Sequence, residues 1–302
     1  MKKTKVMRLL SLLLVMTLIS TCAISGTFAK YVTKAEGKDQ ARVAKWGIVL
    51  TMKDDGFFKS EYETDDTKGY TGLSVKADNE DKLVAPGTSA GEFEATVKGT
   101  PEVATRYILE IPADWADVVL KAGTYTDYTH LVKADDGTYG YTDTFTLEKD
   151  YAPVKWDITV SKGDTTMSLT QAAQAYPALA AAMGGNEYGF SATNAVDIVK
   201  QYGPQLQNLI LTMVSGAQNA SFTVGDDGVI RLALDFEPGK EMDFKFTLKW
   251  AWEFTDAEGE TDVSLNDKAD TYLGNVAAGV ITDENASTEI KFTWTATAVQ
   301  ID

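Results

Sequence analysis

Histidine and cysteine, the usual zinc ligands, are scarce in this 302-residue chain, which has one of each. A zinc-protease helix needs two histidines one turn apart with a glutamate between them, and structural zinc usually takes four histidine or cysteine ligands. The single histidine, His130, lies in the sequence Tyr-Thr-His-Leu-Val, which favours a strand residue over a metal ligand. A conventional histidine-ligated zinc protease is therefore excluded, and we predict no metal site, no catalytic residue and no enzyme.

One serine lies in a pattern typical of hydrolase nucleophiles. Residues 87–91 read Gly-Thr-Ser-Ala-Gly and match G-x-S-x-G, with Ser89 at the nucleophile position. That motif works only on a sharp strand-to-helix turn with a histidine base nearby. Residues 92–97 alternate as a strand instead, so we interpret the match as chance. The sequence also has no G-x-x-x-x-G-K-[ST] loop, and nucleotide chemistry has no support.

Four acidic turns offer oxygen ligands that a calcium ion would accept. They lie at residues 65–66, 78–81, 135–137 and 226–228. None has the D-x-[DN]-x-[DN]-G spacing with its closing glutamate, so we interpret them as solvated turns that keep the protein soluble. We expect no cofactor, and calcium at these turns is the alternative.

The overall charge excludes one class of partner. The chain has 28 Lys and Arg against 44 Asp and Glu, a net charge of −16, whereas a nucleic-acid binder needs a basic face for phosphates. At 44% apolar residues the chain can bury a core, so disorder throughout is not expected.

The first 29 residues read as a signal peptide. Lys2, Lys3, Lys5 and Arg8 precede residues 9–29, which carry no charge. Small residues lead to Thr27-Phe28-Ala29, which predicts cleavage between Ala29 and Lys30. An uncleaved anchor and lipidation at Cys22 are the alternatives, although Thr21 fits a lipidation signal poorly. We expect a secreted protein, extracellular or at the cell surface, that contains no disulfide because Cys22 leaves with the leader.

The rest of the chain reads mostly as strands. Residues 242–252 place six apolar side chains on one face at period two, and residues 230–236 and 290–298 repeat this pattern. Further strands are predicted at residues 46–52, 93–97, 107–111, 128–132, 139–147 and 154–160. Many strands separated by Gly, Asp and Asn turns predict an all-β fold, an antiparallel jelly-roll-like sandwich over residues 43–302.

One stretch departs from the strand pattern. Between about residues 168 and 219, Ala, Gln and Leu replace Val, Thr and Tyr, and apolar residues recur at helical spacing. Pro177 and Gly203-Pro204 interrupt the pattern, and Gly184-Gly185 ends its first part. We predict a helical insertion packed on the sandwich. A membrane-surface or partner-binding helix is disfavoured because the stretch lacks a basic face.

Six segments near the two ends of the chain carry a family resemblance: residues 26–33 (GTFAKYVT), 41–48 (ARVAKWGI), 84–88 (VAPGT), 250–254 (WAWEF), 266–275 (NDKADTYLGN) and 295–302 (TATAVQID). Together they resemble the TasA/camelysin family of exported Gram-positive surface proteins. The ordered set is more specific than any one segment. The resemblance does not extend to residues 115–224. The resemblance implies a jelly-roll-like sandwich and cleavage of the leader by a dedicated signal peptidase.

The resemblance also implies assembly into biofilm-matrix fibres. In the fibre-forming members, the freed N-terminal segment pairs with a sheet of the next subunit. Here that segment is residues 30–42, and the donor strand would consist of Lys30, Tyr31, Val32, Thr33 and Lys34. A donor that differs from its acceptor gives a head-to-tail contact that propagates. A solvated N-terminal tail is the alternative.

We therefore expect a secreted structural protein of the cell surface or biofilm matrix that forms fibres by N-terminal strand donation. Its partners would be itself as a head-to-tail homopolymer, the signal peptidase, and other matrix proteins or glycans. The first alternative is a monomeric surface adhesin or glycan-binding module on the same fold. The second is a camelysin-like protease of unconventional mechanism.

Overall fold

The computed structural model describes residues 42–53, 56–63, 74–79, 81–89, 92–111, 117–184, 187–253 and 264–301. The chain divides into two units, residues 1–43 and 44–302, and only Arg42 and Val43 of the first are among the described residues. The chain is mostly β, with 39% strand and 19% helix, and its sheets are antiparallel. The prediction of a mainly β protein with a helical part is confirmed at this level.

The larger sheet has the strand order β1–β5–β16–β12–β13, and β4 also pairs with β16. Its strands are β1 (Val49–Lys53), β4 (Thr88–Ser89), β5 (Phe93–Gly99), β12 (Val154–Lys162), β13 (Thr165–Ser168) and β16 (Met242–Trp252). The central strand β16 has β12 on one side and β5 on the other, and Trp250 lies opposite Trp156 across the β12 pair. Because side chains alternate along a strand, the six apolar residues at even positions of β16 share one buried face.

The smaller sheet has the order β14–β15–β6–β18. Its strands are β6 (Thr105–Ile111), β14 (Asn219–Val224), β15 (Ile230–Phe236) and β18 (Thr295–Gln300). β14 and β15 form a hairpin around the acidic turn at residues 226–228. The outward face of the sheet carries ion pairs across strands: Arg106 Nε lies 2.6 Å from Asp235 Oδ1, and Arg231 Nε lies 2.6 Å from Glu110 Oε1.

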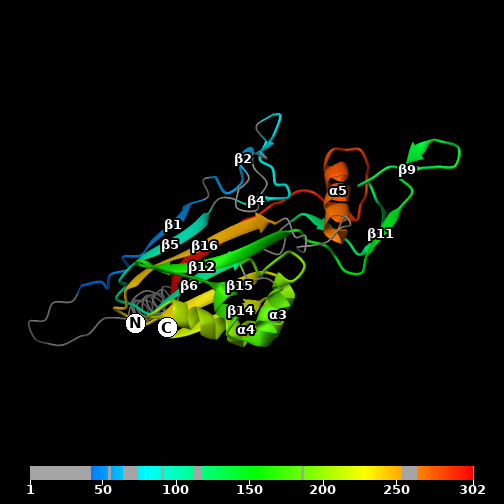
Figure 1. Ribbon diagram of the computed structural model, residues 1–302. Coiled ribbons are helices and arrows are strands. Elements are labelled where there is room, and N and C mark those ends of the chain that lie inside the picture. The colour runs from blue at the N-terminus through cyan, green and yellow to red at the C-terminus, as the bar shows by residue number, and fades with distance from the viewer. Residues whose placement is uncertain are drawn as a thin grey trace, which may run out of the picture. The chain divides into compact units, whose positions relative to one another are not determined.

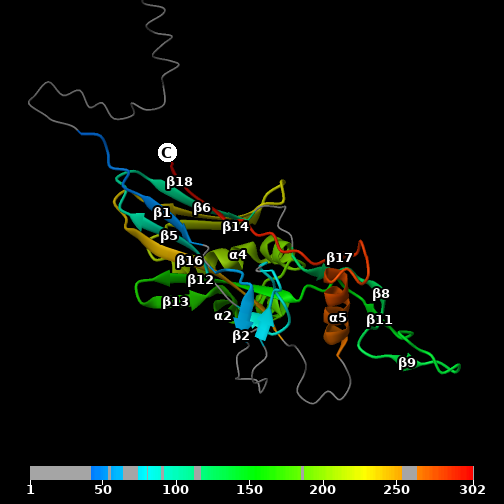
Figure 2. The same cartoon turned by 90° about the horizontal axis from the view of Figure 1, so that it is seen from above.

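Apolar side chains from the two sheets meet in one core. The Tyr107 ring of β6 lies 5.4 Å from that of Phe244 and 6.0 Å from that of Phe246, both on β16. Near the other end, the ring of Phe93 on β5 lies 5.8 Å from Trp294, just before β18. Each pair joins one sheet to the other, so the core holds the sheets together (Figures 1 and 2).

The helical insertion is present where the sequence predicted it. Its helices are α2 (Leu169–Ala173), α3 (Pro177–Met183) and α4 (Ala195–Met213). Pro177 occupies the first turn of α3, and Gly184 ends that helix with φ +69°. Around the predicted break at Gly203-Pro204, α4 continues with a kink, and Tyr202 has non-helical angles. α4 packs against β14 (Figure 1).

A further group of short strands and a helix projects from one end of the sheets (Figure 1). It consists of β7 (Val119–Leu120) with β17 (Ala286–Ser287), β8 (Gly123–Thr126) with β11 (Thr144–Leu147), β9 (Val132–Lys133) with β10 (Tyr139–Gly140), and α5 (Leu265–Ala277). β2 (Glu61–Glu63) and β3 (Ser74–Lys76) form a separate hairpin. α5 was not predicted from the sequence, although Ser264 caps it by accepting a 3.1 Å hydrogen bond from the Asp267 N–H.

Several predicted strand bounds were wrong. The strand expected at residues 290–298 begins only at Thr295, although Trp294 before it is buried. Residues 128–131 form no strand, and the one expected at 139–147 is split into β10 and β11. In the first region, the Asp127 carboxylate accepts a hydrogen bond from the Thr129 N–H, which competes with strand pairing. Between β10 and β11, the Asp143 carbonyl oxygen accepts a 2.8 Å hydrogen bond from the Asp127 N–H.

Candidate functional site

The predicted processing and donor residues lie outside the described part of the chain. They are Ala29 and Lys30 at the cleavage position and Lys30, Tyr31, Val32, Thr33 and Lys34 in the donor strand. These assignments stay predictions. The surfaces that could receive a donor strand, however, lie within the described residues.

The free edge of the smaller sheet carries no charged residue. β18 reads Thr-Ala-Thr-Ala-Val-Gln and pairs with β6 alone. Thr295, Val299 and Gln300 are exposed, whereas Ala296 packs against the core. Free sheet edges in natural proteins are usually protected by lysine, proline or a bulge, because their unpaired N–H and C=O groups can pair with another chain. β18 has neither lysine nor proline, in a chain of which 24% is charged.

The free edge of the larger sheet lies next to β18. β1 pairs only with β5, contacts β18, and carries one charged residue, Lys53, at its end (Figure 2). Val49 on β1 is 61% exposed. The two sheets therefore present two neighbouring strand edges on the same side, and no described strand pairs with the outer edge of either.

At the opposite side of the two sheets, the edge strands are β13 and β14. α4 packs against β14, whereas β13 is exposed over residues 165–167 and leads directly into α2. Lys162 at the end of β12 donates a 2.6 Å hydrogen bond to Ser215 Oγ just after α4, which ties the larger sheet to the end of that helix. For the smaller sheet, strand addition is thus sterically favoured at β18.

The single histidine lies in a turn between β8 and β9, so its predicted place in a strand was wrong. His130 Nε2 is 3.1 Å from Asp143 Oδ2, and its Nδ1 is 3.2 Å from Thr129 Oγ1. Residues 127–131 turn because the Asp127 carboxylate accepts a 2.9 Å hydrogen bond from the Thr129 N–H. His130 therefore lies in this turn, and its position could not be predicted from the strand pattern.

Asp127 is the buried residue among the side chains around His130. Its side chain is fully buried, and Lys268 Nζ of α5 lies 3.0 Å from its Oδ2. Burial pushes its pKa up, but hydrogen bonds from Thr129 and the Lys268 ammonium outweigh this and hold the pKa at about 2. The carboxylate therefore stays ionised at neutral pH and anchors α5 to the base of the β9–β10 hairpin.

The serine motif and the acidic turns have local structural partners. Ser89 ends β4, and the Thr88 N–H donates a 3.0 Å hydrogen bond to Ala85 O, which closes the turn before that strand. Asp136 accepts from Thr138, and Asp227 pairs with Arg231 Nη2 at 2.5 Å. In the part of the chain that the structure describes, no three His, Cys, Asp or Glu side chains meet in a way that could hold a metal ion. Residues 65–66 and 80 lie outside that part.

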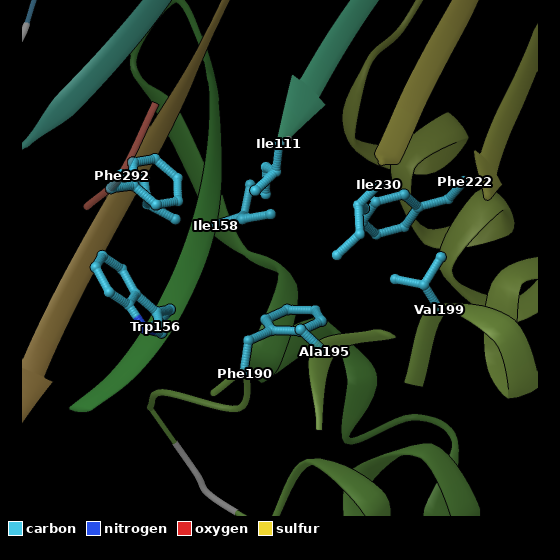
Figure 3. Close-up of a pocket in the computed structure, with 10 residues that line it drawn as sticks. Ile111, Trp156, Ile158, Phe190, Ala195, Val199, Phe222, Ile230 and Phe292 are labelled. Carbon is cyan, nitrogen blue, oxygen red and sulfur yellow. The ribbon is translucent and has the colours of Figure 1, made fainter. Parts of the chain in front are cut away.

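An apolar cavity lies where α4 meets both sheets, as Figure 3 shows. The side chains around it include Trp156 and Ile158 of β12, Phe222 of β14 and Val199 of α4. Its volume is about 20 Å³, which is close to the space that one water molecule needs, and its lining gives a water no polar partner. This cavity is a packing feature of the core and has no room for a ligand.

A cleft lined by polar side chains lies on the outward face of the larger sheet, and we call it the polar cleft. Its lining includes Asp157, Thr159, Ser168, Gln171, Tyr188 and Lys249. Its volume is about 200 Å³. The cleft was not predicted from the sequence, although Asp157 and Thr159, two of the three polar residues that alternate along residues 154–160, were a signal.

The chain matches no protein-family model, and no curated protein or solved structure is significantly similar to it. Among the described residues, no helix has both the length and the apolar character needed to cross a membrane.

Proposed function

We propose that this protein is a secreted structural protein of the cell surface or biofilm matrix that assembles by strand addition at the β1–β18 side. The supporting observation is the uncharged, unpaired edge of β18 beside β1, on the side that the helical insertion leaves open. In this proposal, the two sheets form a jelly-roll-like sandwich, and the donor is residues 30–34 of a neighbouring copy.

The sequence of the donor fits such an edge. Residues 30–34 read Lys-Tyr-Val-Thr-Lys, with β-forming residues between two lysines. Like charges directly opposite each other across strands are destabilising, so an acceptor edge without lysine is favourable for this donor. Main-chain hydrogen bonds would supply the affinity, as in other strand-addition complexes.

The first test compares residues 30–302 with residues 39–302 by sedimentation velocity and negative-stain electron microscopy. We expect filaments from the longer chain alone. Monomers from both chains would refute self-assembly. Filaments from both would support a matrix role but refute N-terminal donation.

A second test locates the acceptor within residues 30–302. Thr295→Lys with Val299→Lys adds two lysines to the exposed face of β18, which is how natural sheets protect an edge. The matched control, Asn219→Lys with Thr223→Lys, adds the same charge to β14 at the other edge of the same sheet. We expect loss of filaments in the first variant alone. Normal filaments from the β18 variant would exclude β18 as the acceptor.

A further inference from the structure

The polar cleft is built on a fixed framework beneath its surface. Asp157 of β12 is 3% exposed, and its Oδ1 accepts a 2.6 Å hydrogen bond from Thr170 Oγ1 and a 3.1 Å hydrogen bond from the Thr170 N–H. Thr170 Oγ1 in turn accepts a 3.0 Å hydrogen bond from the Gly189 N–H. This chain of hydrogen bonds connects β12, the start of α2 and the segment that carries Tyr188.

The segment beside Tyr188 is also held by close packing. The Phe190 and Trp156 backbones exchange two hydrogen bonds, of 2.7 and 3.0 Å. A Cβ on Gly189 would lie 2.9 Å from Met183 Cβ, which cannot swing aside as the end of the side chain does, so glycine favours this close approach to α3. The wall of the cleft is therefore preorganised, which lowers the entropy lost when a ligand binds.

Several polar side chains at the cleft have no protein partner among the residues that the structure describes. They are Thr159, Gln171, Glu187 and Tyr188. Thr159 is 6% exposed and belongs to the lining of the cleft. Gln171 and Glu187 are exposed and Tyr188 is half-buried, so these side chains are open both to solvent and to a bound molecule. The cleft therefore offers hydroxyl, amide and carboxylate groups to an occupant.

The charges around the cleft argue for a neutral occupant. The Asp157 and Glu187 carboxylates disfavour an anion, and the Lys249 ammonium disfavours a small cation. Lys249 lies opposite Asp157 across the β12–β16 pair, and its Nζ is 3.3 Å from Glu92 Oε1. Burial, followed by the nearby Glu187, Glu253 and Asp157 carboxylates, raises the pKa of Tyr188 to about 12. Its hydroxyl stays protonated at neutral pH and can donate a hydrogen bond.

We propose that the polar cleft binds one neutral sugar residue of a polysaccharide. The cleft combines hydrogen-bond donors and acceptors with the Tyr188 ring, and a sugar presents alternating hydroxyl groups on an apolar ring face. Its volume of about 200 Å³ is below the 300 Å³ or more of drug-sized pockets, which suits a single sugar ring. This inference does not rest on self-assembly.

The test uses a panel of neutral trisaccharides, namely maltotriose, cellotriose, mannotriose and chitotriose, with the purified protein. Ligand-observed NMR identifies a binder and calorimetry measures its affinity. We expect millimolar or tighter binding of at least one member, and about a tenfold loss in Tyr188→Phe with Thr159→Val, which removes two hydroxyls and keeps the side-chain shapes. Equal melting temperatures would show that the variant is folded.

The matched control is Tyr139→Phe with Thr223→Val, which makes the same changes on β10 and β14 away from the cleft, and it should bind as the wild type does. The Thr295→Lys with Val299→Lys variant should also bind normally, so a failure of assembly and a failure of sugar binding can be told apart. Absence of binding by every trisaccharide, or binding unchanged in the cleft variant, would overturn the proposal. Binding of lysine amide at the cleft in place of sugars would do so as well.

Discussion

The indole Nε1 of Trp156 donates a 2.7 Å hydrogen bond to Asp117 Oδ2 inside the protein, and both side chains are at least 97% buried. The other carboxyl oxygen, Oδ1, accepts a 2.7 Å hydrogen bond from the Val118 N–H. Burial raises the pKa of Asp117 to about 7, against the lowering effect of these hydrogen bonds. A buried acid is thus held next to the aromatic core of the larger sheet.

Asp117 should make the protein less stable as the pH rises. In the unfolded chain this carboxyl loses its proton near pH 4, whereas in the folded chain it keeps it until about pH 7. The folded state therefore binds more protons between these values, and the contribution of Asp117 to the unfolding free energy falls by up to ~1.4 kcal/mol per pH unit. Asp117→Asn should flatten this slope in denaturant titrations from pH 4 to 8.

The control for this prediction is Asp164→Asn, in the exposed turn between β12 and β13, which should keep the wild-type slope. An unchanged slope in Asp117→Asn would show that another group titrates over this range. The Asp117→Asn variant can also have a lower unfolding free energy at every pH, because one amide oxygen cannot replace the two carboxyl oxygens that accept from Trp156 Nε1 and the Val118 N–H.

The ion pair between Lys268 and Asp127 should stabilise the attachment of α5. Lys268→Met keeps much of the apolar stem but leaves a fully buried carboxylate without its cation, and we expect a loss of ~2 kcal/mol or more. Because the pKa of Asp127 is lowered to about 2, its contribution is present above about pH 4 and is lost as the pH falls toward 2. Denaturant titrations of wild type and variant should therefore converge in acid.

A second lysine provides the control for that prediction. Lys76 on β3 lies 3.0 Å from Glu61, and both side chains are more than half exposed. Lys76→Met should change stability by less than ~0.5 kcal/mol, because exposed ion pairs contribute little. A similar loss in both variants would contradict the role assigned to burial at Asp127.

Asp270 joins α5 to the end of the larger sheet. Its Oδ1 accepts a 2.8 Å hydrogen bond from the Tyr151 hydroxyl, and its Oδ2 accepts a 3.1 Å hydrogen bond from Trp252 Nε1. Asp270→Ala leaves two donors without this acceptor, and we expect a loss of ~2 kcal/mol. Hydrogen exchange should accelerate most in α5, whereas Asp226→Ala in the exposed β14–β15 turn should leave α5 protected.

The sequence predicted the strands and helices that have a regular spacing of apolar residues along the chain. Residues 230–236 and 242–252 alternate strictly, and β15 and β16 have those bounds. The helical insertion was also recognised from its spacing. α5 was missed because its apolar stripe is narrow, with only Ala269, Tyr272 and Leu273 buried.

The polar cleft could be predicted only in part. Alternation along β12 places Asp157 and Thr159 on the face away from the core, and this much is local. Nothing in the spacing shows that Gln171 and Tyr188 close over that face, since their approach depends on the packing of α2 and on the absence of a side chain at Gly189. The free edge of β18 likewise depends on which strands pair with each other. Alternation shows which face of a strand is buried, but it does not show the order of strands in a sheet.

Two glycines inside helices should respond in opposite ways to replacement by alanine. In α5, a Cβ on Gly274 would meet nothing within 4 Å, so Gly274→Ala should raise the unfolding free energy by ~0.5–1 kcal/mol through helix propensity. In α4, a Cβ on Gly203 would lie 2.9 Å from the Phe222 carbonyl oxygen of β14. Backbone cannot move aside as a flexible side chain does, so Gly203→Ala should lower stability by ~1–3 kcal/mol despite the same gain in propensity. Thermal and denaturant unfolding of both variants measure the difference, and a stabilised Gly203→Ala protein would mean that α4 does not lie this close to β14.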